Sequence, residues 1–221
     1  MQIPDIQDWG LIDYDKALAK QEALVQEIAG VKPGVLVFCT HPPTVTVGRK
    51  TEKDDVFNWQ GPLFEISRGG RATYHGPSQI VAYPIWNLDY PAPDGAAGWP
   101  RRDIHFYLRA LEKMLVDVVA EYGIEASGKS GLATLPTNTE ETGLWVDGKK
   151  LGSIGIGVRK WVAFHGIALN VDHDPQAFQG INPCGFSRET MVSMEELLLG
   201  RKLDRRLLQR QIAENFQKIF S

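Results

Sequence analysis

The sequence has few cysteines and no long apolar run, and these absences exclude several classes of protein. It contains two cysteines, Cys39 and Cys184, among 221 residues. These are too few for a disulfide framework, so a reducing, cytoplasmic compartment is the default expectation. The apolar runs are far shorter than the roughly 20 residues of a membrane-spanning helix, and we expect no membrane association. The first residues have neither a basic segment nor an apolar stretch, so we expect no secretory signal.

The chain also lacks a large net charge and the residue spacings of common cofactor sites. Its formal net charge of −3 gives no general reason to expect nucleic-acid binding. It has no Cys-x-x-Cys pair, no His-x-x-x-His pair and no Walker phosphate loop, which argues against a metal or nucleotide site. The composition, 43% hydrophobic and 23% charged, is that of a globular protein with one sizeable core.

Apolar periodicity and turn residues predict an alternation of helices and hairpin-connected strands. Helical spacing predicts helices over 13–29, 103–122 and 204–220, and a capping box opens a short helix at Ser193. Apolar runs predict strands over 35–39, 44–47, 63–67, 80–84, 150–158 and 161–171, with a loop over 87–102. Asp147-Gly148 predicts a hairpin turn after a strand at 144–146. This order indicates an α+β fold, in one domain over residues 1–221, rather than repeated βαβ units.

A polar, glycine-containing segment, residues 68–79, lies between two of the predicted strands. Its paired glycines allow the backbone to approach a ligand closely, and its arginines, hydroxyls and imidazole can orient that ligand. A glycine-rich turn with solvated polar groups explains the same composition. The segment alone therefore leaves both interpretations open.

Cys184 is the candidate nucleophile of this sequence. Pro183 and Gly185 predict a tight turn that presents the thiol beside free backbone N–H groups, which can stabilise an oxyanion during acyl transfer. A partly buried, unreactive turn cysteine is the alternative. Cys39 lies in an apolar run and is expected to be a small buried hydrophobe.

A nucleophilic cysteine needs a neighbour that favours the thiolate, because a free thiol is mostly protonated at neutral pH. Five histidines and two adjacent lysines are candidates. Strand alternation places Lys149 and Lys150 on opposite faces, so at most one of them faces a pocket. The alternative is that both lysines are solvated at the end of the hairpin.

A basic cluster follows the short helix near the end of the chain. It can receive an acidic partner protein, or it can simply be the solvated face of a helix. The cluster comprises Arg201, Lys202, Arg205, Arg206 and Arg210.

Residues 68–77 resemble the signature of the lipoyl(octanoyl) transferases. Four further segments, 41–49, 148–155, 164–171 and 181–185, match that family in the same order, so the resemblance extends from about Trp9 to about Phe220. It implies the fold of biotin and lipoate protein ligases, related to the class II synthetase core. In that fold a mixed, mostly antiparallel sheet is flanked by helices.

The resemblance also implies a reaction and its partners. An octanoyl (or lipoyl) group passes from acyl carrier protein to a cysteine as a thioester. It then passes to a lysine of a lipoyl domain of 2-oxoacid dehydrogenases, or of the glycine-cleavage H protein, without a cofactor. Cys184 matches the family nucleophile. Lys150, which directly precedes Leu-Gly-Ser-Ile-Gly, matches the lysine that activates it. The matching substrate-contact residues are Arg68, Gly69, Gly70, Arg71, Ala72, Thr73, Tyr74, His75, Ser153, Ile154, Gly155, Gly166, Ile167 and Ala168.

One departure and two alternatives accompany this resemblance. Ser78 stands where the family usually has glycine, so we expect either backbone strain of about 1 kcal/mol or a narrower site. The first alternative is an ATP-dependent lipoate–protein ligase, whose matching block carries Asp where this chain has Gly76. The second is a catalytically inactive module that binds carrier proteins.

Overall fold

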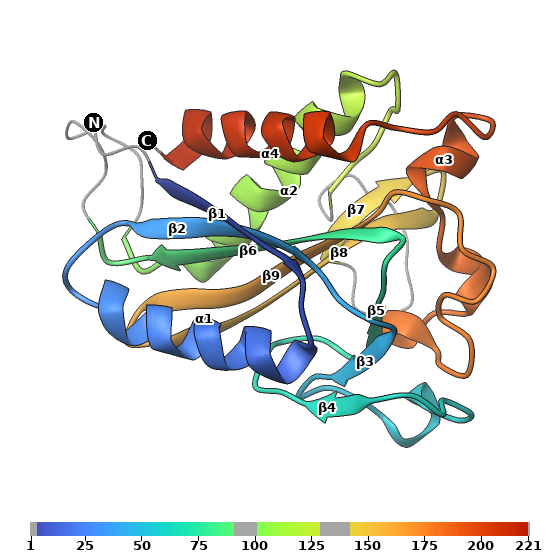
Figure 1. Cartoon of the computed structure of the whole chain (residues 1–221), viewed down its shortest axis with the longest axis horizontal. Helices are drawn as coiled ribbons and strands as arrows, with labels where there is room; N and C mark the ends of the chain where they lie inside the picture. The colour runs from blue at the N-terminus through green and yellow to red at the C-terminus, as the bar shows by residue number, and fades with distance from the viewer. Residues whose placement is uncertain (1–3, 91–100, 129–141, 221) are drawn as a thin grey trace.

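A computed structural model describes residues 4–90, 101–128 and 142–220 of the chain. These residues form two sheets, with helices against both faces of the larger sheet (Figure 1). The elements in chain order are β1 (Asp5–Leu11), α1 (Tyr14–Ile28), β2 (Gly34–Thr40), β3 (Thr44–Val47), η1 (Lys53–Asp55), β4 (Leu63–Glu65), β5 (Thr73–His75), β6 (Gln79–Asn87), α2 (Ile104–Ala120), β7 (Gly143–Val146), β8 (Lys149–Arg159), β9 (Val162–Asn170), η4 (Pro183–Gly185), η5 (Arg188–Thr190), α3 (Met194–Leu197) and α4 (Arg205–Phe220).

The larger sheet has six strands in the order β1-β2-β6-β9-β8-β7. Its β1–β2 pair is parallel, and its other pairs are antiparallel. The smaller sheet has the order β4-β3-β5, with β3 parallel to β4 and antiparallel to β5. The predicted α+β class, with mixed and mostly antiparallel sheets flanked by helices, is confirmed.

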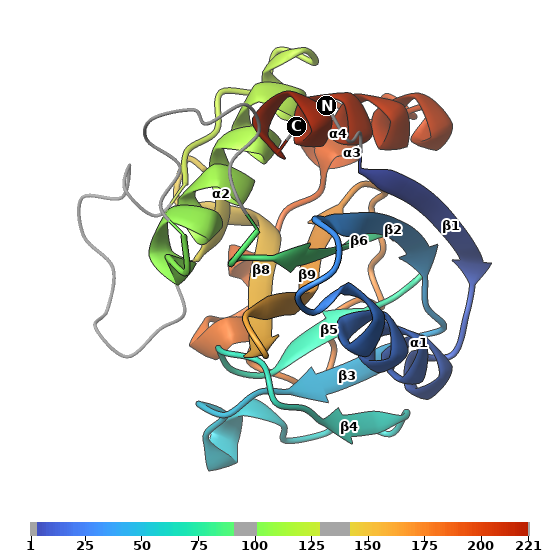
Figure 2. The ribbon, with the colours of Figure 1, turned by 90° about the vertical axis from the view of Figure 1, so that its left-hand side faces the viewer.

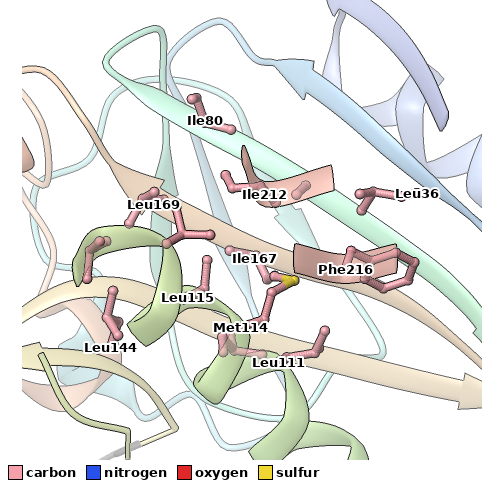
Figure 3. Close-up of a cluster of buried hydrophobic side chains, with 14 of the residues drawn as sticks. Leu36, Ile80, Leu111, Met114, Leu115, Leu144, Ile167, Leu169, Ile212 and Phe216 are labelled. Carbon is pink, nitrogen blue, oxygen red and sulfur yellow. The ribbon is translucent and has the colours of Figure 1, made fainter. Parts of the chain in front are cut away.

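The six-stranded sheet is covered on both faces because its strands carry apolar residues at successive positions. In β2, Val35, Val37 and Cys39 pack toward α1, whereas Leu36 and Phe38 join the core under α2 and α4. That second core contains Met114, Ile167 and Phe216 among its members (Figure 3). Alternation along the strand thus fills both cores. Cys39 is a buried hydrophobe, as expected, and burial raises the pKa of its thiol to about 12.

Most predicted elements are present, and the differences have local causes. The hairpin turn has positive φ at Asp147 (48°) and Gly148 (75°), as a two-residue turn of this type requires. Strand β1 was not predicted because it is an edge strand with no apolar period. Strand β4 ends at Glu65, two residues earlier than predicted, and β6 extends to Asn87, into the predicted loop. The rest of that loop includes residues 91–100, which lie outside the described residues.

The two sheets meet along the glycine-containing segment. Figure 2 shows the three-stranded sheet below the six-stranded sheet and next to α1. On the small-sheet side, Arg68 Nη2 donates to the carbonyl oxygen of Thr46 at 2.9 Å. On the large-sheet side, the Gly69 N–H donates to the carbonyl oxygen of Ile156 in β8, also at 2.9 Å. Residues 68–71 are therefore fixed between the sheets, where a pocket opens.

Candidate active site

The pocket between the sheets contains most of the residues that the resemblance implied. It encloses about 470 Å³ of empty space, including its open mouth. The expected residues that line it are Arg68, Gly69, Gly70, Arg71, Thr73, His75, Ser153, Ile154, Gly155, Gly166, Ile167, Ala168 and Cys184. The pocket thus brings together four separate stretches of the chain: residues 68–75, the middle of β8, the middle of β9 and the η4 turn.

Cys184 lies in the η4 turn with its thiol at the pocket wall. Its backbone adopts φ 57° and ψ 20°, a left-handed conformation uncommon for a side-chain-bearing residue. Its N–H donates to the carbonyl oxygen of Ala72 at 2.7 Å, which joins the turn to the start of β5. Its Sγ lies 3.7 Å from the hydroxyl oxygen of Ser153 in β8. The thiol is therefore held between the two sheets, and only 4% of the residue is exposed.

The backbone N–H groups expected to be free beside Cys184 are occupied. Besides the bond from Cys184 itself, the Gly185 N–H donates to Asn182 at 3.1 Å and the Phe186 N–H donates to Pro183 at 3.0 Å. The expectation of a ready oxyanion hole in this turn is wrong, because the tight turn uses its own amides to close. A donor for a developing oxyanion must come from another part of the pocket wall.

Lys150 is fully buried next to the same aromatic side chains as Cys184, whereas Lys149 is exposed. Its Nζ lies 5.2 Å from the ring centroid of Trp145 and 5.7 Å from that of Phe186. Trp145, Phe186 and Cys184 form one buried cluster. The two lysines thus face opposite sides, as strand alternation predicted. Lys150 does not line the pocket itself; it lies behind the Cys184 turn, where its charge interacts with two aromatic faces.

Arg71 supports the Cys184 turn through a buried ion pair. Its Nε and Nη2 bind the two carboxylate oxygens of Asp55 at 2.9 and 2.5 Å, and Nη2 also binds Glu52 at 2.9 Å. A side chain at Gly185 would meet the guanidinium at 2.7 Å, so glycine is needed for this close approach. The Asp55 carbonyl oxygen also accepts the Asn182 N–H at 2.8 Å.

Sequence reasoning missed Asp55, because the acidic residues 52–55 have the composition of a solvated turn.

Aromatic and imidazole side chains line the inner part of the pocket. The rings of Tyr14 and His75 stack with centroids 5.8 Å apart. Burial lowers the pKa of His165 to about 3, and it lowers the pKa of His75 well below its usual value. Nδ1 of His75 and both ring nitrogens of His165 are buried without a hydrogen-bond partner among the described residues. Both imidazoles are therefore neutral and available to a polar group of a ligand.

Four lining residues were absent from the expected set: Tyr14, Tyr83, Thr142 and His165. His165 could have been identified from the sequence, because it directly precedes Gly166 within the segment 164–171 that matches the family. Tyr14 opens helix α1 and carried no such signal.

Three residues of the segment 68–79, namely Ala72, Tyr74 and Ser78, do not line the pocket. Alternation along β5 points Thr73 and His75 into the pocket and Tyr74 away from it, against Trp59 and Phe178. Ala72 is buried and contributes its carbonyl oxygen to the Cys184 turn. Ser78 is not among the residues with positive φ, and its hydroxyl donates to Asp174 at 3.3 Å, outside the pocket. The strain and the narrowing considered for Ser78 are both absent.

The described residues contain neither a metal-binding cluster nor a membrane-spanning helix. Within residues 4–90, 101–128 and 142–220, no group of three or more His, Cys, Asp or Glu side chains is arranged to hold a metal ion. In the same part of the chain, no helix has the length and apolar character needed to cross a membrane.

Comparison with known proteins gives a consistent set of relatives. The family described as Lipoyl protein ligase A/B catalytic domain matches residues 13–217. An octanoyltransferase of Bdellovibrio bacteriovorus is 52% identical over 202 residues, which cover 90% of this chain and 90% of that protein. An octanoyltransferase of Geobacter metallireducens is 40% identical over 212 residues, which cover 96% of this chain and 91% of that protein.

Solved structures show a similar fold at low sequence identity. The crystal structure of lipoate-protein ligase A bound with ATP aligns with a TM-score of 0.75 at 17% identity, over 98% of this chain and 85% of that chain. Biotin protein ligase from Aquifex aeolicus, in complex with biotin and ATP, aligns with a TM-score of 0.53 at 10% identity, over 98% and 70%. The expected likeness to lipoate and biotin ligases is therefore confirmed at the level of the fold.

Proposed function

The chain belongs to the lipoyl protein ligase A/B catalytic domain family and is an acyltransferase that transfers octanoyl groups, and we propose that it does so through a thioester on Cys184. The proposed donor is octanoyl-acyl carrier protein. The proposed acceptors are lysines of the lipoyl domains of 2-oxoacid dehydrogenases and of the glycine-cleavage H protein. The observation that carries this proposal is the joint packing of Cys184 and Lys150 against Trp145 and Phe186, at the wall of the pocket.

The proposed reaction has two steps, acylation of Cys184 and transfer of the acyl group to the acceptor amine. The Cys184 thiolate attacks the carbonyl carbon of the donor thioester. A new C–S bond forms, the donor C–S bond breaks, and the donor sulfur leaves and takes up a proton. The acceptor amine then attacks the Cys184 thioester, so that a C–N bond forms and the C–S bond to Cys184 breaks. The amine proton passes to the released cysteine sulfur. Thioester exchange is nearly neutral in energy, and amide formation drives the sequence forward.

Lys150 has an electrostatic role in this proposal. An ammonium group close to a thiol favours the thiolate, which is the reactive form. Burial among aromatic rings strengthens this effect, because little solvent is present to screen the charge. The same charge also favours the negatively charged tetrahedral intermediate through space, which matters because the amides of the η4 turn are already used.

An ATP-dependent ligase reaction is the alternative on the same fold. Such an enzyme needs no cysteine, and its matching sequence block carries Asp at the position of Gly76. A side chain at Gly76 would collide with the hydroxyl of Tyr74, so the segment after β5 does not accommodate Asp at this position. The likeness to lipoate-protein ligase A, at 17% identity, concerns the fold and not the reaction.

Intact-protein mass spectrometry tests the proposed intermediate. After incubation with octanoyl-acyl carrier protein, we expect one octanoyl adduct on the wild-type chain and none on Cys184→Ala. The matched control is Cys39→Ala, at the other, buried cysteine, which should keep the adduct. An unmodified wild-type chain, combined with labelling of a lipoyl domain that requires octanoate and ATP, would replace this proposal with the ligase reaction.

The same assay tests Lys150 against its exposed neighbour. We expect Lys150→Met to form the adduct about 100-fold more slowly, as for loss of a group that acts directly on the nucleophile. Lys149→Met should acylate at the wild-type rate, because Lys149 is on the other face of the hairpin. Equal acylation rates in the two variants would remove Lys150 from the mechanism.

A further inference from the structure

A second, open groove shares a wall with the Cys184 pocket. The residues that belong to both are Gly69, Gly70, Thr142, Ile154 and Gly155. The rest of the groove lies between the start of α2, the outer half of β8 and the residues after β3, and comprises Arg49, Lys50, Ile104, His105, Leu108, Arg109, Ile156 and Val158. A ligand in this groove therefore reaches the segment that forms the mouth of the pocket.

The groove is positively charged on a protein whose formal net charge is −3. Arg49, Lys50, His105 and Arg109 line it, and no acidic side chain lines it within the part of the chain that the structure describes. Arg109 is held in place by Glu112, which is nearly fully buried, at 2.6 Å. The floor between the basic groups is apolar. Such a surface suits an extended ligand that has both an apolar or amide-rich length and an anionic group.

The basic rim is connected directly to the pocket wall. The Arg49 N–H donates to the carbonyl oxygen of Arg68 at 3.2 Å, and the Lys50 N–H donates to that of Gly70 at 3.1 Å. Because Gly69 and Gly70 line both cavities, the charged groups are fixed relative to the site where the thioester must lie. The groove and the pocket thus adjoin along Gly69 and Gly70.

We propose that this groove binds the pantetheine arm of the acyl donor, with Arg49 and Lys50 facing the phosphodiester that links the arm to its carrier. This inference rests on the proposed function, in which the donor is a carrier-bound thioester. The arm is extended, rich in amides and methylenes, and it carries its negative charge at the end far from the thioester. That distribution matches a groove whose basic rim lies outside a pocket that contains the nucleophile.

The basic cluster at α4 is a less suitable site for this arm. Arg205 is paired with Asp172 at 2.7 Å, and Lys202 is paired with Glu195 at 2.8 Å, both at the end of the chain that contains α4. No residue of that cluster lines the pocket that contains Cys184. Arg206 is an exposed member of the cluster and provides a matched control for charge reversal.

The experiment compares two small donors that differ only in the phosphate: octanoyl-phosphopantetheine and octanoyl-pantetheine. The rate of adduct formation on Cys184 is measured at subsaturating donor in the full chain. The informative quantity is the rate with octanoyl-phosphopantetheine divided by the rate with octanoyl-pantetheine. We expect this ratio to fall about tenfold in Arg49→Glu and in Lys50→Glu, and we expect the wild-type ratio to fall with added salt. Arg206→Glu should keep the wild-type ratio.

The outcomes separate this inference from the function on which it rests. If wild-type protein forms the adduct with both donors and the ratio is the same in all variants, the groove does not bind the phosphate. If the variants lose rate only with the complete carrier protein, the groove binds the carrier surface and not the arm, which also overturns the proposal. If no donor modifies Cys184, the proposed function itself fails.

Discussion

At the scale of single residues, the Cys184 turn is held by groups that are distant in the sequence. The Arg71 guanidinium lies against Gly185. Two of the guanidinium nitrogens donate to the carboxylate of Asp55, which precedes Arg71 by sixteen positions. Asp55 also accepts the Asn182 N–H through its backbone carbonyl. The left-handed conformation of Cys184 costs on the order of 1 kcal/mol or more, and the surrounding contacts must offset it. The Arg71–Asp55 pair therefore supports the turn that carries the proposed nucleophile.

We expect Asp55→Asn to destabilise the protein by about 3 kcal/mol, because it removes the buried carboxylate that balances the Arg71 charge and leaves the guanidinium with the exposed carboxylate of Glu52. Urea unfolding measures this loss. Acylation of Cys184 should also slow at temperatures where the variant is folded, since the turn loses its support. Asp54→Asn is the matched control, because the Asp54 side chain is exposed and only its backbone carbonyl contacts Asn182. Equal stability of the two variants would contradict the role of the pair.

The sequence marked the proposed nucleophile and its lysine neighbour but not the residues that support them. Cys184 was marked by its flanking proline and glycine and by the resemblance, and Lys150 was chosen over Lys149 by the resemblance alone. Asp55 was not found because a buried carboxylate depends on a partner brought to it by the fold. For the same reason, the use of the η4 amides inside the turn was not visible: composition shows a tight turn but not the destination of its N–H groups.

At the scale of elements, a gap in the hydrogen bonding between β6 and β9 shapes the pocket. The β6–β9 ladder is interrupted between the pairs Ala82–Ile167 and Trp86–Ala163. Pro84 lies in that gap and has no N–H to donate. Across the gap, His165 has φ 60°, and its N–H turns to the side-chain oxygen of Gln21 in α1 at 2.8 Å. Helix α1 thus completes the hydrogen bonding of a strand and holds His165 at the pocket wall.

Replacing Gln21 tests this coupling between helix and strand. Gln21→Leu leaves the buried His165 N–H without an acceptor, and we expect a loss of about 2 kcal/mol in the free energy of unfolding. Gln26→Leu, at an exposed position of the same helix, should change it by less than about 0.5 kcal/mol. Hydrogen exchange at the His165 amide should also accelerate in Gln21→Leu alone. Unchanged exchange would show that Gln21 does not protect this amide.

The elements that sequence patterns predicted are those with strong local signals. Helices α2 and α4 have long apolar periods, and the β7–β8 hairpin has a characteristic turn. Strand β5 was hidden because three residues inside a glycine-containing segment are too short for a period. The parallel pairings of β1 with β2 and of β3 with β4 could not be predicted, because the choice of a distant partner strand is made by the tertiary structure.

At the scale of the whole molecule, the site exists only where the two sheets meet. Residues 68–75 come from the smaller sheet and its preceding segment, whereas 153–155 and 165–168 come from the larger one. The resemblance indicated which residues belong to the site, but only the packing of the sheets shows that Tyr14 and Tyr83 close it. That packing buries three imidazoles, those of His41, His75 and His165.

These imidazoles make the stability of the folded chain sensitive to acid. In the unfolded chain a histidine takes up a proton near pH 6.5, whereas burial keeps His165 neutral down to about pH 3 and also lowers the pKa of His41 and His75. Below pH 6.5 the unfolded state therefore binds more protons, so the free energy of unfolding falls as the pH falls. His165 contributes about 1.4 kcal/mol to this loss between about pH 7.5 and about pH 5.5, and His41 and His75 contribute in the same direction.

His165→Gln tests the contribution of one imidazole. Urea unfolding of this variant should show a pH-dependent loss about 1.4 kcal/mol smaller than that of the wild type between about pH 7.5 and about pH 5.5, whatever its stability at neutral pH. The exposed His105→Gln should keep the wild-type dependence. The difference between the two pH values is the informative quantity, because the lost packing of His165 affects both equally. An identical pH dependence in His165→Gln and in the wild type would mean that this imidazole can be protonated inside the folded protein.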